Sequence, residues 1–343
     1  MGWYYIIVGI LGLALLMVVH EGGHLLAARA FGMRVIKFSI GFGPALWRHQ
    51  PKGSETIYQI ALIPFLAYVQ IAGMNPLEEV DPDDKTSYAN ASLVARISAI
   101  FAGPLANYLF ASVLFFAAFM IGGKPVPTTK IDVMDEGAAK TAHMKDGDEI
   151  VSIDGKRIDS WDQMRNIILA SPGKKLEIGL KRNGKDLTVK VTPEPKAEKG
   201  GGQIGVYPIP KNIPMTAKEA AVRSVVYPAN VVQALVVGLA RIITGKEKAQ
   251  LTGPVGIVKE TSRAVERSWP DYLYLLGLLS AYLGGFNLVP FPALDGGRLM
   301  FLGYEAVTRR RPDARVEASV HAVGLFMLLA LILVVSVFDI RGN

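Results

Sequence analysis

The sequence His20-Glu21-Gly22-Gly23-His24 follows an apolar stretch, residues 1–19, that has no charged side chain. Side chains four residues apart project from the same face of a helix, so both imidazoles can reach one metal ion. Glu21 stands beside them, where its carboxylate can accept a proton from an attacking water. Ionisable side chains at membrane depth are costly and mark functional sites. The stretch therefore predicts a membrane helix with hydrolytic chemistry inside the bilayer.

A third metal ligand is expected elsewhere in the chain. Zinc in catalytic sites takes three protein ligands and leaves one position for water, whereas the pentapeptide supplies two. With five His in 343 residues, a His-Glu-x-x-His pattern arises by chance in roughly one of several hundred such chains. The alternative is a polar cluster that only packs two helices together.

The composition indicates an integral membrane protein. Hydrophobic residues make up 50% of the chain, and the mean hydropathy of +0.30 is too high for an ordinary soluble enzyme. The net charge is +7, but the basic residues form no stripe with interleaved aromatics, so membrane edges explain them better than nucleic acid does. The absence of cysteine excludes disulfides and thiolate metal sites. No Lys or Arg precedes the first apolar run, so we expect it to be a retained span and not a signal peptide.

Four apolar segments are long enough to cross a hydrocarbon core, which takes about 20 residues; they are residues 3–28, 97–123, 272–294 and 318–338. The polar block between the second and the third contains short alternating runs that predict strands. Asn183-Gly184 is a hairpin signal, and Ser160 is placed to cap a short helix. The predicted fold is a polytopic α-helical membrane protein with four transmembrane helices and an inserted α+β domain. The predicted regions are a first membrane half, the inserted domain, an interfacial helical linker and a second membrane half, at residues 1–123, 124–210, 211–270 and 271–343.

Positive charges gather in two loops, one after the first predicted span and one after the third. They are Arg34, Lys37, Arg48 and Lys52, and Arg298, Arg309, Arg310, Arg311 and Arg315. The positive-inside rule makes both loops cytoplasmic. Both termini and the inserted domain are then expected outside the cytoplasm, and the pentapeptide near the cytoplasmic side of the membrane.

Asp295 is the candidate for the third ligand. It ends the third predicted span, shortly after Pro290 and Pro292, which cannot both lie in an unbroken helix. Unwound backbone at membrane depth is tolerated only where it is buried in protein or lines a wet cavity, and a hydrolytic site needs such a cavity. Gly296 and Gly297 are expected to let this backbone approach the helix that carries the histidines. The alternative is that Asp295 only caps a helix at the cytoplasmic surface.

Residues 224–240 are also apolar enough to form a span. A fifth crossing would place Asp295 on the opposite membrane face from the pentapeptide, tens of ångströms away at about 1.5 Å per helical residue. Pro228 and the flanking Arg223 and Arg241 suit a bent helix at the interface. We therefore expect residues 222–243 to lie at the interface, with a span as the alternative.

Three stretches together resemble a known family: residues 20–24, residues 103–107 (Gly-Pro-Leu-Ala-Asn) and residues 287–297 (Asn-Leu-Val-Pro-Phe-Pro-Ala-Leu-Asp-Gly-Gly). In this order they resemble the site-2 protease family of intramembrane zinc metalloproteases, above all its bacterial branch, the RseP-type regulators of envelope stress. Further matching stretches lie at residues 38–44, 251–257 and 339–341. The resemblance thus extends over nearly the whole chain.

The resemblance implies three ligands for Zn²⁺ and one general base, which are His20, His24, Asp295 and Glu21. It implies that Asn287 holds substrate or polarises the scissile carbonyl, in a substrate-binding segment with Pro290 and Pro292. Members of the family cleave single-span membrane proteins within the transmembrane segment, usually after a site-1 protease has removed the external domain. The expected partners are therefore such membrane proteins, an upstream protease and the lipid bilayer, and no nucleic acid.

Residues 55–73 are predicted to open the substrate helix. Residues 56–62 and 68–72 have strand composition, with Pro64 at the turn between them. The resemblance implies a membrane-associated β-hairpin here, which binds substrate by strand addition through Tyr68 and Val69. Residues 65–67 (Phe-Leu-Ala) depart from the Gly-rich turn expected in the family. An ordinary interfacial hairpin is the alternative.

The inserted block, from residue 124 to about residue 208, resembles a circularly permuted PDZ domain. The resemblance rests on residues 146–155 and 203–206, whereas residues 142–144 (Ala-His-Met) depart from the usual small-Gly-Leu triplet. We expect it to exclude substrates that still have bulky external domains, with a passive spacer as the alternative. The leading prediction is thus a zinc endopeptidase of a bacterial inner membrane. A catalytically inactive PDZ scaffold and a transporter with a broken helix are the other readings.

Overall fold

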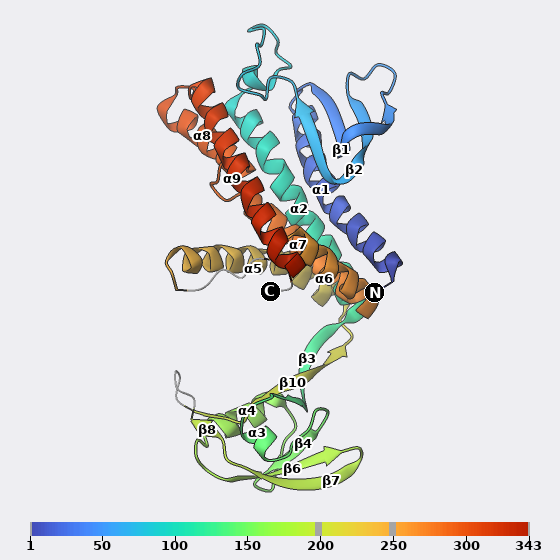
Figure 1. The fold of residues 1–343 in the computed structure, drawn as a ribbon, viewed down its shortest axis with the longest axis vertical. Helices are drawn as coiled ribbons and strands as arrows, with labels where there is room; N and C mark the ends of the chain where they lie inside the picture. The colour runs from blue at the N-terminus through green and yellow to red at the C-terminus, as the bar shows by residue number, and fades with distance from the viewer. Residues whose placement is uncertain (1, 196–200, 247–251, 342–343) are drawn as a thin grey trace. The chain divides into compact units, whose positions relative to one another are not determined.

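The computed structural model describes residues 2–195, 201–246 and 252–341 of the chain. It divides into two compact units (Figure 1). The helical unit comprises Met1–Ile121 and Thr216–Asn343, and the inserted domain comprises Gly122–Met215. Each unit has its own buried core and is described by itself.

The helical unit contains α1, α2 and α5 to α9. Their bounds are α1 (Trp3–Ala30), α2 (Leu93–Gly122), α5 (Ala217–Ile243), α6 (Pro254–Arg267), α7 (Trp269–Asn287), α8 (Asp295–Thr308) and α9 (Ala314–Arg341), and a short 3-10 turn, η1, spans Tyr88–Asn90. Small residues let these helices pack closely, because Gly9, Gly12 and Gly23 of α1 are all buried. A Cβ at Gly12 would overlap the hydroxyl of Tyr272 in α7.

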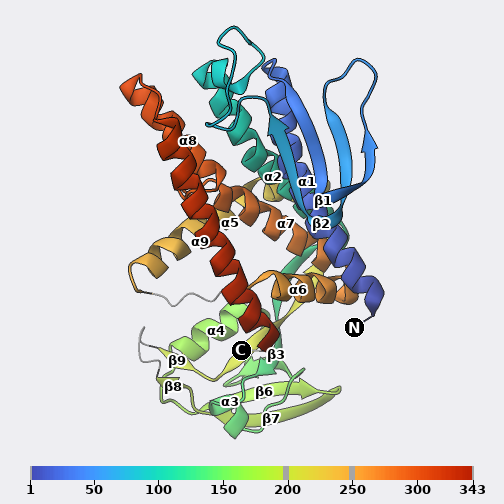
Figure 2. The ribbon, with the colours of Figure 1, turned by 45° about the horizontal axis from the view of Figure 1, so that its top comes forward.

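Four described helices are long and apolar enough to cross a membrane, namely Trp3–Ala30, Leu93–Gly122, Ala217–Ile243 and Ala314–Asp339. The number agrees with the prediction, but the set differs in one member. The third predicted segment, residues 272–294, is not among them: α7 ends at Asn287 and residues 288–294 are not helical, so the chain breaks where Pro290 and Pro292 predict it. Pro290 and Pro292 cannot continue the hydrogen-bond ladder of the helix. α5 has the required length and composition instead, and Figures 1 and 2 show it crossing the direction of α1, α2 and α9.

A sheet of two long strands, β1 (Val35–His49) and β2 (Ile57–Ile71), lies beside α1 (Figure 2). Residues 37–40 of β1 pair with residues 70–67 of β2 and also with residues 57–60, while residues 45–49 pair with residues 61–58. The first half of β1 therefore lies between the two halves of β2. The predicted hairpin within residues 55–73 is thus wrong in its pairing, because its two strand stretches both pair with β1 and not with each other. In the described part of the chain, no strand pairs with the outer edge of residues 67–71.

The inserted domain is an α+β fold. Its main sheet has the order β10-β3-β4-β6-β7, with β5 paired to β4, and β8 pairs with β9. The strands are β3 (Lys124–Val133), β4 (Glu149–Ile153), β5 (Lys156–Arg157), β6 (Leu176–Arg182), β7 (Lys185–Val191), β8 (Glu194–Pro195), β9 (Gly202–Gln203) and β10 (Val206–Ile213), and the helices are α3 (Ala138–Thr141) and α4 (Trp161–Leu169). Ile131, Ile150 and Ile178 are fully buried in the core of this domain.

Two local predictions in this domain are confirmed. β6 and β7 form an antiparallel hairpin across Asn183-Gly184, and both turn residues have positive φ, +50° and +81°, as a two-residue hairpin turn requires. Ser160 caps α4, because its hydroxyl accepts a hydrogen bond from the backbone N–H of Gln163.

Candidate active site

His20 and His24 point from one face of α1 into the interior of the helical unit. They are 4% and 5% exposed, and their rings lie edge to face with centroids 4.8 Å apart. Gly23 lies between them on α1, where a Cβ would overlap the backbone carbonyl of Ala102 in α2. The glycine therefore lets α1 lie close enough to α2 for the two imidazoles to contact it.

One face of α2 fixes both rings. Ala99, Gly103 and Asn107 recur every four residues and so share this face. The Nδ1–H of His24 donates to the backbone carbonyl of Ala99 over 2.8 Å, and the Asn107 amide nitrogen lies 3.1 Å from Nδ1 of His20. A Cβ at Gly103 would overlap the imidazole of His24. The stretch Gly103 to Asn107 thus shapes the pocket that holds the two rings.

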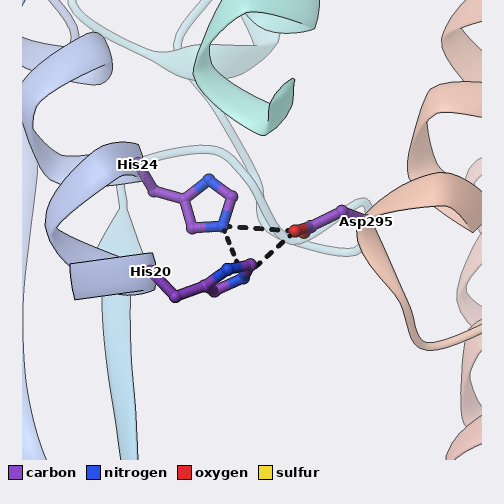
Figure 3. A group of neighbouring side chains, drawn as sticks. All are labelled: His20, His24 and Asp295. Atoms are coloured by element: carbon purple, nitrogen blue, oxygen red, sulfur yellow. Dashed lines mark hydrogen bonds and ion pairs between the residues drawn. The ribbon is translucent and has the colours of Figure 1, made fainter. Parts of the chain in front are cut away.

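Asp295 approaches the same point from α8 (Figure 3). Its Oδ2 lies 3.2 Å from Nε2 of His20 and 3.4 Å from Nε2 of His24. Asp295 is the first residue of α8, and its carboxylate faces the two histidines. The preceding Ala293 has a φ of +73°, and its N–H donates to Nδ1 of His321 in α9 over 3.0 Å.

We expected Gly296 and Gly297 to let their backbone approach α1, and this is wrong because the backbone that lies against them is that of residues 288–292. A Cβ at Gly296 would overlap the carbonyl oxygen of Val289, and one at Gly297 would overlap that of Phe291. The two glycines therefore let the non-helical residues 288–294 fold back on the start of α8, and do not bring backbone against α1. This fold-back holds Asp295 where its side chain reaches the histidines.

The three side chains fit a zinc ion. Their donor atoms are 3.2, 3.3 and 3.4 Å apart, and tetrahedral zinc with bonds of about 2.0–2.1 Å requires ligand atoms roughly 3.3–3.4 Å apart. Oδ2 of Asp295 is buried and faces the Nε2 atoms of both histidines. Because a carbonyl can only accept, the proton of a neutral His24 ring is on Nδ1, which leaves the lone pair of Nε2 for a metal. Within the described ranges, this is the one group of three such residues that could hold a metal.

Glu21 connects this cluster to the sheet. Its Oε2 accepts a hydrogen bond of 3.0 Å from the backbone N–H of Val69, on the outer edge of β2. Val69 therefore contacts the predicted general base, and Tyr68 lies next to it on the strand, where it pairs with Ser39.

The other predicted substrate-binding residues lie in α7 and in the segment that follows it. The amide of Asn287 donates to the carbonyl of Leu283 within α7, over 2.9 Å. Pro290 and Pro292 line a cavity of about 450 Å³ with Phe301 and Tyr304 of α8. Among the described side chains, none of these three residues forms a hydrogen bond with His20, His24 or Asp295.

Sequence reasoning missed the residues that orient the ligands. The contact of Ala99 uses its backbone carbonyl, which has no sequence signal. Asn107 belongs to the stretch 103–107, which indicates the family, but that stretch does not predict that Asn107 contacts His20. His321 is isolated in the sequence, so nothing there indicates that it holds Ala293.

The model of peptidase family M50 matches residues 8–331. The chain belongs to this family. An M50 relative, the zinc metalloprotease RasP of Geobacillus kaustophilus, is 33% identical over 95% of each chain. The regulator of sigma-W protease RasP of Bacillus subtilis is 29% identical over 95% of this chain and 96% of its own. A solved PDZ domain of the SdrC-like protein from Listeria monocytogenes is 24% identical over 24% of this chain and 86% of its own, with a TM-score of 0.22.

Membership in this site-2 protease family confirms the predicted family, the zinc metalloprotease class and the zinc cofactor. The long apolar helices and the bacterial relatives make this M50 protease a multi-pass protein of the inner membrane.

Proposed function

We propose that this M50 protease cleaves single-span membrane proteins within or near their transmembrane segment. The observation that carries the proposal is the convergence of Nε2 of His20, Nε2 of His24 and Oδ2 of Asp295 within 3.4 Å of one another. Two of these ligands lie in the same long apolar helix, α1. A hydrolytic centre in such a helix acts on peptide bonds at membrane depth.

In this proposal His20, His24 and Asp295 hold the zinc ion. When bound, zinc lowers the pKa of water and polarises a carbonyl oxygen. Glu21 is the general base, which takes the proton of the attacking water and returns it to the leaving amine. The hydrogen bond from Val69 N–H fixes one carboxylate oxygen of Glu21, so the other oxygen is free for this transfer.

We further propose that substrate binds in extended form along the outer edge of β2. The residues Tyr68, Val69, Gln70 and Ile71 of this edge line a cavity of about 460 Å³, with Arg298 and His321 also among its lining residues. Adding a strand satisfies the backbone hydrogen bonds that an unwound transmembrane helix loses. Asn287 and the non-helical segment with Pro290 and Pro292 complete the substrate-binding region in this proposal.

The arrangement in the membrane follows from the charged loops. With both positively charged segments cytoplasmic, the active site lies near the cytoplasmic side and the PDZ-like inserted domain lies outside. There it blocks substrates that still have large external domains. Cleavage by an upstream protease then has to come first. One relative has the regulation of sigma-W in its name, so a membrane-bound anti-sigma factor is a fitting substrate class, as is a remnant signal peptide.

The test uses the full chain in proteoliposomes with a single-span substrate, in versions with and without a folded external domain. The parent is expected to cut the shortened substrate within its span, as read by mass spectrometry of the fragments. Glu21→Gln should abolish cleavage and keep zinc, while Glu266→Gln, at an exposed glutamate of α6, should match the parent. Equal cleavage by Glu21→Gln would refute the assigned base. Cuts only outside the bilayer would refute intramembrane proteolysis, and zinc binding without any cleavage would favour an inactive scaffold.

A further inference from the structure

Asn107 is a fully buried polar residue in the middle of α2. Its amide nitrogen lies 3.1 Å from Nδ1 of His20, and its Oδ1 is buried without a hydrogen-bond partner. An unpaired buried oxygen costs stability, so the presence of an amide at this position requires an explanation. The neighbouring ring supplies one.

His20 can bind a metal through Nε2 only if the proton of its neutral ring is on Nδ1. In the amide orientation seen here, the Asn107 nitrogen donates to Nδ1, which leaves the ring proton on Nε2. Half a turn of the amide about its Cβ–Cγ bond exchanges its oxygen and nitrogen. Oδ1 then accepts from Nδ1–H, the unpaired oxygen gains a donor, and Nε2 of His20 is free for the metal.

The other histidine has the corresponding partner already. His24 donates from Nδ1 to the carbonyl of Ala99, two helical turns before Asn107 on the same face of α2. The carbonyl of Asn107 itself accepts from the hydroxyl of Ser280 in α7, over 2.8 Å. Because the backbone carbonyl of Asn107 is already used in this way, the group of Asn107 that faces His20 is its side-chain amide. An amide suits this position because it can serve the ring with or without metal.

We propose that Asn107 is a positioning residue that sets the tautomer and orientation of His20 for zinc binding, with its amide oxygen accepting from Nδ1–H in the metal-loaded protein. The inference rests on the proposed role of His20 as a zinc ligand. Acceptors of this kind, which contact a ligand and not the metal, typically change metal affinity by about 10- to 100-fold.

The test compares zinc dissociation constants, measured by chelator competition in the detergent-purified full chain. Asn107→Leu keeps a similar volume but offers no acceptor, and should bind zinc about 10- to 100-fold more weakly. Asn107→Asp keeps an acceptor and should bind close to the parent value. Ser280→Ala removes the other contact of Asn107 and should leave zinc affinity unchanged. A packing role alone would weaken both Asn107 variants alike.

Two results would overturn the proposal: zinc binding by Asn107→Leu as tight as in the parent, or by Asn107→Asp as weak as in Asn107→Leu. If Asn107→Leu fails to fold, Asn107→Ala takes its place, with the melting temperature of each metal-free variant as the folding control. His20→Ala separates this inference from the proposed function. If His20→Ala binds zinc like the parent, the ligand assignment itself fails.

Discussion

Gly103→Ala would add one methyl group against the ring of His24. The new Cβ would overlap three atoms of that ring, whereas non-bonded atoms keep about 3.5–4.0 Å between them. The Nδ1 of the ring is held by the carbonyl of Ala99, so the ring cannot turn away without losing that bond. A shift on the order of 1 Å results, well beyond the ±0.2 Å that metal ligation tolerates.

We therefore expect Gly103→Ala to lower zinc affinity and cleavage by about 100-fold, the usual cost of a 1 Å misplacement. Chelator competition and substrate cleavage in proteoliposomes give the two values. Gly303→Ala is the matched control, because a Cβ there meets no atom within 4 Å; it should match the parent. Parent-like zinc affinity in Gly103→Ala, in protein that melts at the parent temperature, would refute the view that this face of α2 shapes the metal site.

Three further predictions concern contacts that hold the fold together. Burial is the largest influence on the pKa of the Asp148 carboxyl and raises it, but the hydrogen bonds and charges of Arg182 and Lys145 together outweigh burial and hold the pKa below its usual range. The stabilisation is therefore present above about pH 4 and is lost as pH falls through the folded pKa. It should be absent in Asp148→Asn, which hydrogen exchange of β4 and β6 against pH will test. Arg96→Met breaks the ion pair of two hydrogen bonds that joins Arg96 of α2 to Glu305 of α8, whose side chains are 8% and 15% exposed. We expect the free energy of unfolding to fall by about 3–5 kcal/mol and zinc binding to weaken. A melting temperature within roughly 1 °C of the parent, as for a neutral surface change, would contradict this. Asp339→Ala removes the carboxylate that accepts hydrogen bonds from the backbone N–H groups of Gly253 and Gly256, at the start of α6. Thermal unfolding should show a free energy of unfolding lower by about 1–2 kcal/mol. An unchanged melting midpoint would exclude this capping role.

The parts of the site that the sequence predicts are those set by local geometry. The i, i+4 spacing of His20 and His24 places both rings on one helix face whatever surrounds the helix. Two prolines close together end α7 regardless of its neighbours, so a carboxylate just beyond them can be recognised as a candidate ligand. The turn at Asn183-Gly184 and the cap at Ser160 are local in the same sense, and both are found as predicted.

The parts that the sequence does not predict depend on contacts between distant segments. Residues 57–60 and 67–70 both read as strands, but only the folded chain places residues 37–40 between them. α5 and α7 are both apolar, but of the two only α5 is long and apolar enough to cross a membrane. Gly296 and Gly297 are needed for close approach, as predicted, but the backbone that approaches them is that of residues 288–291.

The histidine pair shows how these two kinds of information combine. The spacing on α1 gives two imidazoles but not the direction of their lone pairs. That direction is set from α2, through a carbonyl at Ala99 for one ring and an amide at Asn107 for the other, and the charge that faces them comes from Asp295 at the start of α8. In the proposed site the donor atoms belong to α1 and α8 and their orienting partners to α2, so a bound zinc ion would tie three helices together. On this proposal metal binding and the packing of these helices are coupled, so we expect contacts that do not touch the metal, such as Arg96–Glu305 between α2 and α8, to affect metal affinity.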